Sequence, residues 1–222
     1  MINLQNVTYA YQKKKVLDDI NLHIEINERC ALVGRNGAGK STMIKTMLGL
    51  QPMQKGTISL GGISNKKQGW KKIVSYLPEK FHLYPHLTGE ENIRFFASLD
   101  AKKIDEERII EMLKMVSLYE SRGEQITGYS KGMLQRLGLA VILYYDSDII
   151  ILDEPTSGLD PMGRKEILQI IKSLENKTIL MASHHLSEIE KVCTHVAYLE
   201  NGKVTKYTIE EFIRVQMKEE YA

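Results

Sequence analysis

A glycine-rich loop near the start of the chain reads Gly34-Arg35-Asn36-Gly37-Ala38-Gly39-Lys40-Ser41. It matches the pattern G-x-x-x-x-G-K-[ST], which phosphate-binding loops place between a strand and a helix. The flanking segments fit, because CALV at 30–33 is typical of a short buried strand and STMIKTMLGL at 41–50 of a helix that ends near Gly49. A chance glycine turn would not explain this order of strand, loop and helix. The stretch therefore predicts a site for a nucleoside triphosphate.

The chemistry of this loop follows from its residue types. Glycines let successive backbone N–H groups turn inward around phosphate oxygens, and the next helix adds the partial positive charge of its N-terminus. Lys40 would reach the β- and γ-phosphates, and the Ser41 hydroxyl would be a ligand of Mg²⁺.

The composition excludes several other classes of protein. With 222 residues, 43% hydrophobic and 26% charged, the chain can bury a substantial core and is not typical of disorder. A net charge of +2 gives no reason to expect a nucleic-acid partner. Cys30 and Cys193 are too few for a disulfide scaffold, and we expect them to be buried or incidental. We find no signal-peptide pattern, and no apolar run approaches the ~18–20 residues of a membrane-spanning helix.

Short apolar segments separated by helical patterns indicate a mostly parallel sheet. IIIL at 149–152, TILMA at 178–182 and HVAYL at 195–199 are apolar enough for buried strands, and Asp160-Pro161 would begin a helix after the first of them. VLDDINLHIEIN at 16–27 instead alternates, which predicts a half-buried strand with one apolar face formed by Ile20, Leu22, Ile24 and Ile26. Helices that alternate with buried strands predict an α/β fold.

The middle of the chain is helical. Thr88 and Glu91 form a T-x-x-E capping box, and Asp105 can cap a second helix. Residues 88–145 therefore read as a helical insert within one α/β domain.

Two acids end a buried strand, as Ile149-Ile150-Ile151-Leu152-Asp153-Glu154. Ligands of open α/β sheets bind at the carboxyl ends of the strands. Asp153 fits the metal-associated acid of phosphate-loop proteins, and Glu154 could orient or deprotonate a water that attacks the γ-phosphate. The alternative, two acids that merely cap the next turn, is much weaker beside the phosphate loop.

Tyr129-Ser130-Lys131-Gly132-Met133 lies before this acid pair and opens a helical pattern. Together with the loop, the acids and the insert, it resembles the signature of the ATP-binding subunits of ABC transporters, usually written L-S-G-G-Q. Ser130 can cap the helix, whose free N–H groups can address an anion. The resemblance implies that Ser130, Lys131, Gly132 and Met133 meet the γ-phosphate of ATP held by a second subunit, in a head-to-tail dimer that encloses two ATP molecules.

This signature departs from the usual one at Tyr129, Lys131 and Met133. Such variants resemble those of subunits that serve ABC-2-type permeases, often exporters. Ser157-Gly158-Leu159-Asp160 resembles the D-loop of the family, which communicates across the dimer, although Asp160 can also cap its own helix. Ser183-His184-His185 follows a strand where the family has its switch histidine, and alignment with S-H-x-L-S-E assigns the γ-phosphate contact to His184.

The resemblance also assigns the remaining positions of the site. Tyr11 lies where the family has an aromatic residue that stacks on adenine, with Tyr9 as the rival. Glu79 lies at the Q-loop position, where most members carry glutamine, and could direct an oxygen toward Mg²⁺ or the attacking water. The nucleotide-binding set implied is Tyr11, Gly34, Arg35, Asn36, Gly37, Ala38, Gly39, Lys40, Ser41 and Thr42; the catalytic set is Lys40, Glu154 and His184; and the Mg²⁺-associated set is Ser41, Glu79 and Asp153. The apolar segment 81–87 would dock on a permease or pack beneath the insert.

The resemblance implies a P-loop NTPase with a RecA-like core, an N-terminal antiparallel β part and an inserted helical subdomain. We expect one domain over 1–222, with the nucleotide-binding core at 1–87 and 146–222 and the signature in the insert at 88–145. The expected function is an ATP-binding and ATP-hydrolysing subunit, with ATP and Mg²⁺ as cofactors, that powers export by a separately encoded membrane permease. It would act as a homodimer or heterodimer, without nucleic acid, at the cytoplasmic face of the membrane.

Two alternatives remain open. A soluble ABC ATPase of DNA repair or of ribosomes would carry a long coiled-coil insertion or two tandem cassettes, and this sequence has neither. A nucleotide-binding regulatory module that does not hydrolyse ATP is the second, because Glu79 and the altered signature depart from the family pattern. Lys40, Asp153, Glu154 and His184 argue against it.

Overall fold

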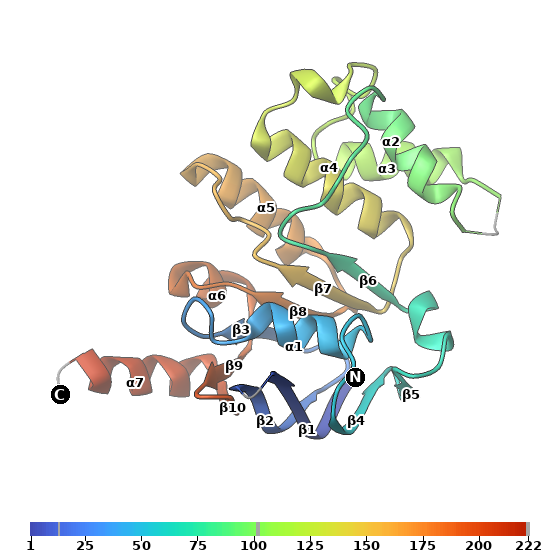
Figure 1. Cartoon of the computed structure of the whole chain (residues 1–222). Helices are drawn as coiled ribbons and strands as arrows, with labels where there is room; N and C mark the ends of the chain where they lie inside the picture. Colours follow the sequence, from blue (N-terminus) through green and yellow to red (C-terminus); the bar gives the residue numbers. More distant parts are fainter. Residues whose placement is uncertain (13, 101–102, 221–222) are drawn as a thin grey trace.

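The computed structural model of the chain describes residues 1–12, 14–100 and 103–220 (Figure 1). Its larger sheet has the order β10-β9-β3-β8-β7-β6, and a smaller antiparallel sheet has the order β2-β1-β4-β5. The strands are β1 (Ile2–Tyr11), β2 (Lys14–Ile24), β3 (Arg29–Val33), β4 (Lys55–Leu60), β5 (Ile63–Ser64), β6 (Val74–Leu77), β7 (Ile149–Asp153), β8 (Thr178–Ala182), β9 (His195–Glu200) and β10 (Lys203–Thr208). The helices are α1 (Lys40–Met47), η1 (Gly69–Lys72), α2 (Gly89–Ala97), α3 (Glu106–Met115), η2 (Ile126–Gly128), α4 (Lys131–Tyr144), α5 (Pro161–Ser173), α6 (Leu186–Val192) and α7 (Ile209–Glu220).

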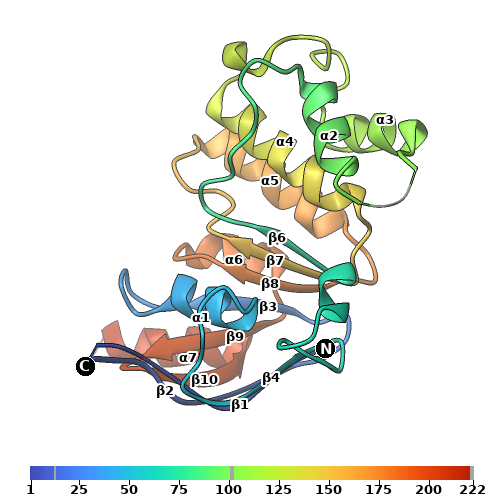
Figure 2. The same ribbon diagram turned by 45° about the vertical axis from the view of Figure 1, so that its right-hand side comes forward.

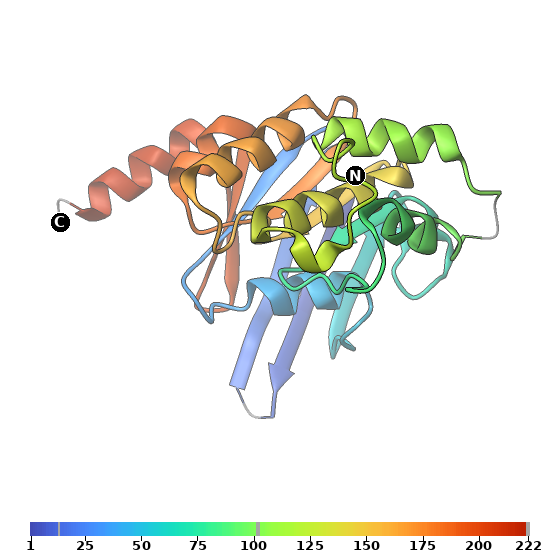
Figure 3. The same cartoon turned by 90° about the horizontal axis from the view of Figure 1, so that it is seen from above.

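The elements are stacked in layers, with α1 between the two sheets and α2–α5 above the larger sheet (Figure 2). Two apolar cores hold these layers together. Strand β7 contributes to both, because Ile149 and Ile151 belong to the core shared with α1 and the small sheet, whereas Ile150 and Leu152 belong to the core shared with the helices. A strand covered on both faces has no polar side, which explains the unbroken apolar run in the sequence. Seen from above, α7 extends away from the rest of the chain (Figure 3).

The large sheet brings distant loops together. Strands β3, β6, β7, β8 and β9 pair in parallel, and only β10 pairs antiparallel to its neighbour. Parallel strands end at the same edge of a sheet, so the phosphate loop after β3, the acid pair at the end of β7 and the histidine pair after β8 emerge side by side. The mixed fold with an antiparallel part and a parallel part confirms the predicted α/β class.

The predicted helix starts are confirmed. Thr88 accepts a hydrogen bond from the backbone of Glu91 and donates its own backbone N–H to that carboxylate, which completes the capping box of α2. Asp105 caps α3 and Asp160 caps α5 through their side chains. Helices α2, α3 and α4 pack around one core with Ile93, Leu113 and Leu137 among its buried residues.

The predicted strand at 16–27 is wrong at its end. Ile20, Leu22 and Ile24 are buried as expected, but β2 ends at Ile24, and Ile26 is 70% exposed. The chain turns there because the backbone N–H of Glu28 bonds the carbonyl of Glu25 and Asn27 adopts a left-handed φ of 61°. Among the described residues, no helix combines the length and the apolar character needed to cross a membrane.

Candidate nucleotide-binding and active site

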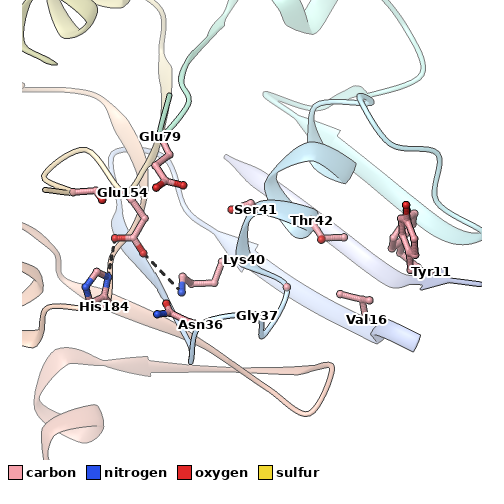
Figure 4. Close-up of a pocket in the computed structure, with 13 residues that line it drawn as sticks. Tyr11, Val16, Asn36, Gly37, Lys40, Ser41, Thr42, Glu79, Glu154 and His184 are labelled. Carbon is pink, nitrogen blue, oxygen red and sulfur yellow. Dashed lines mark hydrogen bonds and ion pairs between the residues drawn. The ribbon is translucent and has the colours of Figure 1, made fainter. Parts of the chain in front are cut away.

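A cavity of about 510 Å³ opens where the loops after β3, β6, β7 and β8 meet the hairpin of β1 and β2 (Figure 4). It is lined by Tyr9, Tyr11, Val16, Asn36, Gly37, Gly39, Lys40, Ser41, Thr42, Glu79, Glu154, Ser157 and His184. Most of the residues predicted for the nucleotide and for catalysis therefore lie around one space. The predicted residues Gly34, Arg35 and Ala38 complete the phosphate loop, and Asp153 lies beneath it in contact with Ser41.

The phosphate loop has the conformation that its glycines permit. Gly39 caps α1 with a φ of 110°, and a Cβ atom there would lie 2.7 Å from Val16 Cγ1. A Cβ atom on Gly34 would lie 2.5 Å from the backbone oxygen of Leu199. Both positions therefore require glycine, one for its backbone angle and both for space. Helix α1 begins directly at Lys40, so its free N–H groups face the cavity.

Lys40 and Glu154 form the centre of the site. Lys40 is only 8% exposed, donates a hydrogen bond to the carbonyl of Gly34 at 2.8 Å and lies 3.8 Å from Glu154 Oε1. Glu154 Oε2 lies 2.9 Å from His184 Nδ1, and because a carboxylate accepts, the histidine nitrogen donates in this hydrogen bond. Figure 4 shows the glutamate between the lysine and the histidine. A carboxylate fixed from both sides can orient a water molecule.

The backbone of Glu154 is unusual. Its φ of 52° lies in the left-handed region, which non-glycine residues seldom adopt and which stores strain. The residue is held there because its N–H bonds the carbonyl of Ala182 and its carbonyl accepts from Ser157. The first bond extends the pairing of β7 with β8 by one residue, and the second closes a turn directly after it. The side chain of Glu154 lines the cavity at this point.

Asp153 is the buried acid of the site, with 3% of the residue exposed. Burial raises the pKa of its carboxyl, and Glu154 and Glu79 raise it further, whereas the hydrogen bond from Ser41 and the charge of Lys40 oppose the change. Ser41 Oγ lies 3.4 Å from Asp153 Oδ1. The hydroxyl and carboxylate oxygens thus offer the type of donor that Mg²⁺ prefers.

Glu79 enters the cavity from the segment after β6. It is exposed, and Figure 4 shows its carboxylate on the side of Ser41. Tyr76, three residues earlier, has its pKa raised to about 12, first by burial and then by Asp153 and Glu79. Asp153 is therefore close enough to both other carboxylates, Glu154 and Glu79, and to Lys40 for their charges to affect it.

The opposite end of the cavity is aromatic. Tyr11 lines it and is 65% exposed, and Tyr9 lines it as well, so the geometry does not choose between the two candidates for adenine. Sequence reasoning did not identify Val16, and it placed Ser157 in the D-loop without assigning it to the nucleotide site, although both residues line the cavity. Val16 could have been suspected only from the glycine it packs against, whereas Ser157 lies three residues after Glu154 and begins the D-loop.

The signature residues lie elsewhere. Ser130 caps α4 by accepting a hydrogen bond from the backbone of Met133 at 3.2 Å. Ser130, Lys131 and Gly132 line a separate cavity of about 410 Å³ with Gly158 and Asp160 of the D-loop. The Lys131 ammonium lies against Gly158, where a side chain would collide with it. The signature and the D-loop are thus neighbours, but the signature does not line the cavity of the phosphate loop in the same chain.

A phosphate loop opening a helix, beside an acid pair that ends a parallel strand, defines the class of P-loop nucleoside triphosphatases. The family described as ABC transporter matches residues 17–157. A lantibiotic transport ATP-binding protein of Streptococcus pyogenes is 35% identical over 206 residues, which cover 92% of this chain and 89% of the relative. A linearmycin resistance ATP-binding protein of Bacillus subtilis is 33% identical over 92% of this chain and 68% of its own length.

The chain belongs to the ABC transporter family, and it is an ATP-binding protein and ATP hydrolase of that family. A solved ATP-binding subunit of an ABC transporter is similar over 98% of this chain and 93% of its own, with a TM-score of 0.86 and 30% identity. A dimeric ATP-binding cassette in a post-hydrolysis state, bound to ADP and phosphate, has a TM-score of 0.82 and 26% identity over 94% of this chain and 99% of its own.

Proposed function

We propose that this chain hydrolyses ATP to power export by a separately encoded membrane permease. The observation that carries the proposal is the single cavity in which Lys40, Glu154 and His184 meet. Export is supported by the relatives, one named for lantibiotic transport and one for linearmycin resistance. The chain would form one domain, with a nucleotide-binding core at 1–87 and 146–222 and a helical insert at 88–145.

In the proposed reaction each side chain has one task. Lys40 and the loop N–H groups hold the β- and γ-phosphates, and Glu154 orients the attacking water and accepts its proton. His184 fixes the rotamer of Glu154 and faces the γ-phosphate. Ser41 and Asp153 are the residues that would hold Mg²⁺, with Glu79 near by; when bound, the ion neutralises phosphate charge.

The active unit would be a head-to-tail homodimer or heterodimer. Support comes from the position of Ser130, which lies in a cavity apart from the phosphate loop of its own chain. Helix α4 has no acid in its first turn, so its positive end lacks a negative partner on that turn. A partner subunit would bring the phosphate loop and its ATP to this end. The dimeric cassette among the similar structures supports the same arrangement.

The permease would dock on a second cavity, of about 640 Å³, beside the end of α1 and η1. Leu50 on its wall is 64% exposed, and the buried acceptors Gln51 Oε1 and Asn65 Oδ1 make no hydrogen bond to a described residue. An amphipathic cytoplasmic segment with N–H donors would satisfy these groups. Tyr76 lines this cavity, and the chain runs from it to Glu79 in the nucleotide cavity, which gives a short mechanical connection.

The segment 81–87, for which the sequence allows docking or packing, does not line this cavity. Phe81 packs against Phe96 with ring centroids 5.2 Å apart, and Tyr84 contacts Phe95 at 4.3 Å. Tyr84 nevertheless remains 45% exposed. Both predicted roles therefore have support, packing for Phe81 and docking for Tyr84. The chain would accordingly lie on the cytoplasmic face of the membrane without entering it.

The test is reconstitution with the permease. The chain and the integral membrane protein encoded beside it are placed in lipid vesicles, and phosphate release is measured with and without the permease. We expect the permease to bind the chain, and Leu50→Asp to abolish this binding while the basal ATPase rate persists. An ATPase rate and a distribution that are independent of any membrane protein would favour the soluble ABC ATPase instead.

A further inference from the structure

A buried acid lies behind the nucleotide cavity without lining it. Glu188, on α6, is only 4% exposed. A carboxylate taken from water costs several kcal/mol unless partners compensate for the lost hydration. The partners of Glu188 therefore indicate what the residue does.

One oxygen of Glu188 joins two loops of the site. Its Oε2 accepts a hydrogen bond from Thr156 Oγ1 at 2.7 Å and another from Ser183 Oγ at 3.2 Å. Thr156 follows two residues after Glu154, and Ser183 immediately precedes His184. Both hydroxyl residues are fully buried, so neither side chain can exchange this acceptor for bulk water.

The second oxygen faces a cation. Glu188 Oε1 makes no hydrogen bond to a described residue, and Arg164 Nη1 lies 3.9 Å from it. Arg164 also donates through Nε to the carbonyl of Leu159 at 2.9 Å, and its Nη1 lies 3.3 Å from His185 Nε2. The arginine thus connects the D-loop with the loop that carries the two histidines.

We propose that Glu188 is a positioning residue for ATP hydrolysis. By holding Thr156 and Ser183 on one oxygen, it fixes the separation of Glu154 and His184, and its charge keeps Arg164 against the D-loop. The inference rests on the roles proposed above for Glu154 and His184. A group that sets the geometry of a base should affect the chemical step more than the binding of substrate.

The experiment compares Glu188→Ala and Glu188→Gln in the full chain, with phosphate release measured over a range of MgATP concentrations. Alanine should lower kcat by about 10- to 100-fold, because small displacements of positioned groups have effects of this size. KM should change by less than about twofold, since Glu188 does not line the cavity. Glutamine keeps an acceptor oxygen for the two hydroxyls, so its kcat should lie closer to wild type than to the alanine variant.

The matched control is Glu190→Ala, which removes an exposed glutamate from the same helix and should leave kcat unchanged. If Glu188→Ala does not fold, Thr156→Val, which keeps the shape but removes one hydroxyl, must lower kcat in its place. Wild-type kcat in whichever of these two variants folds, or a loss confined to KM, would overturn the proposal. Failure of the proposed roles is separate, because Glu154→Gln would then hydrolyse ATP normally.

Discussion

Replacing Glu154 by glutamine tests the proposed chemistry most directly. The change keeps the shape of the side chain but removes the group that can accept a proton, and loss of a general base lowers kcat by about 10²- to 10⁴-fold. This loss in kcat corresponds to an increase of about 3–5 kcal/mol in the activation free energy. In the wild type the two carboxylate oxygens lie 2.9 Å from His184 and 3.8 Å from Lys40. The amide of glutamine has only one acceptor oxygen, so it can interact favourably with one of these donors. Its NH₂ group then faces the other donor.

Binding of ATP should survive the same change. The carboxylate of Glu154 repels phosphate charge from beside Lys40, so its removal should leave the Kd for MgATP unchanged or lower it. With binding intact and hydrolysis slow, an ATP-bound dimer should accumulate. Size-exclusion chromatography with MgATP measures the dimer, and phosphate release measures turnover.

Glu190→Gln is the matched control, an exposed glutamate converted to the same amide, and it should behave as wild type. Turnover of Glu154→Gln within about twofold of wild type would refute the assignment of the base, since a general base typically contributes about 10²-fold or more. Loss of ATP binding together with turnover would refute it as well, because it would place Glu154 in binding instead of chemistry.

Two further predictions concern stability. Gly39→Ala should lower the free energy of unfolding by about 1–3 kcal/mol, because φ is 110° and the new Cβ would lie 2.7 Å from Val16 Cγ1. Urea denaturation measures this loss. Gly123→Ala is the control and should lose far less stability, because no atom of a described residue beyond its chain neighbours lies within 4 Å of a Cβ at that position. The hydrogen bond from Lys177 lowers the pKa of Asp146 below the ordinary value of 3.8. The pair therefore stabilises the fold above that pH. This stabilisation is lost as the pH falls through the lowered pKa of Asp146. The stability gap between wild type and Lys177→Met should therefore close in acid, and a gap that stays constant to about pH 2 would contradict it.

Much of the fold could be read from the sequence because its signals are local. The capping box at Thr88, the N-caps at Asp105 and Asp160 and the apolar run of β7 each depend on neighbours within a few residues. The end of β2 could not be read in this way. Alternation continues through Ile26, but a turn at Asn27 removes Ile26 from the sheet before β3 begins at Arg29.

In the site, too, residues marked by local sequence patterns could be predicted, whereas those placed by contacts between distant segments could not. Motifs identify Lys40, Glu154 and His184 because fixed spacings place the first at the start of a helix and the other two just after strands. Val16 lines the cavity only because the β1–β2 hairpin folds over Gly39, and no residue spacing in the sequence predicts that contact. Glu188 lies within a recognisable segment, and its donor Ser183 is only five residues away, but its second donor, Thr156, lies 32 residues earlier in the loop after β7, and no local pattern predicts that contact.

The nucleotide cavity is rich in negative charge at the end where Lys40 is buried. Asp153, Glu154 and Glu79 bring three carboxylates to the end where Lys40 is buried, and the raised pKa of Asp153 records both its burial and its acidic neighbours. A bare triphosphate would meet net repulsion there despite the N–H groups of the loop. A divalent cation held by Ser41 and Asp153 would supply positive charge that offsets this repulsion. Glu79, where the family pattern has a neutral glutamine, makes the balance more negative, so this site should depend on Mg²⁺ more strictly than one with glutamine.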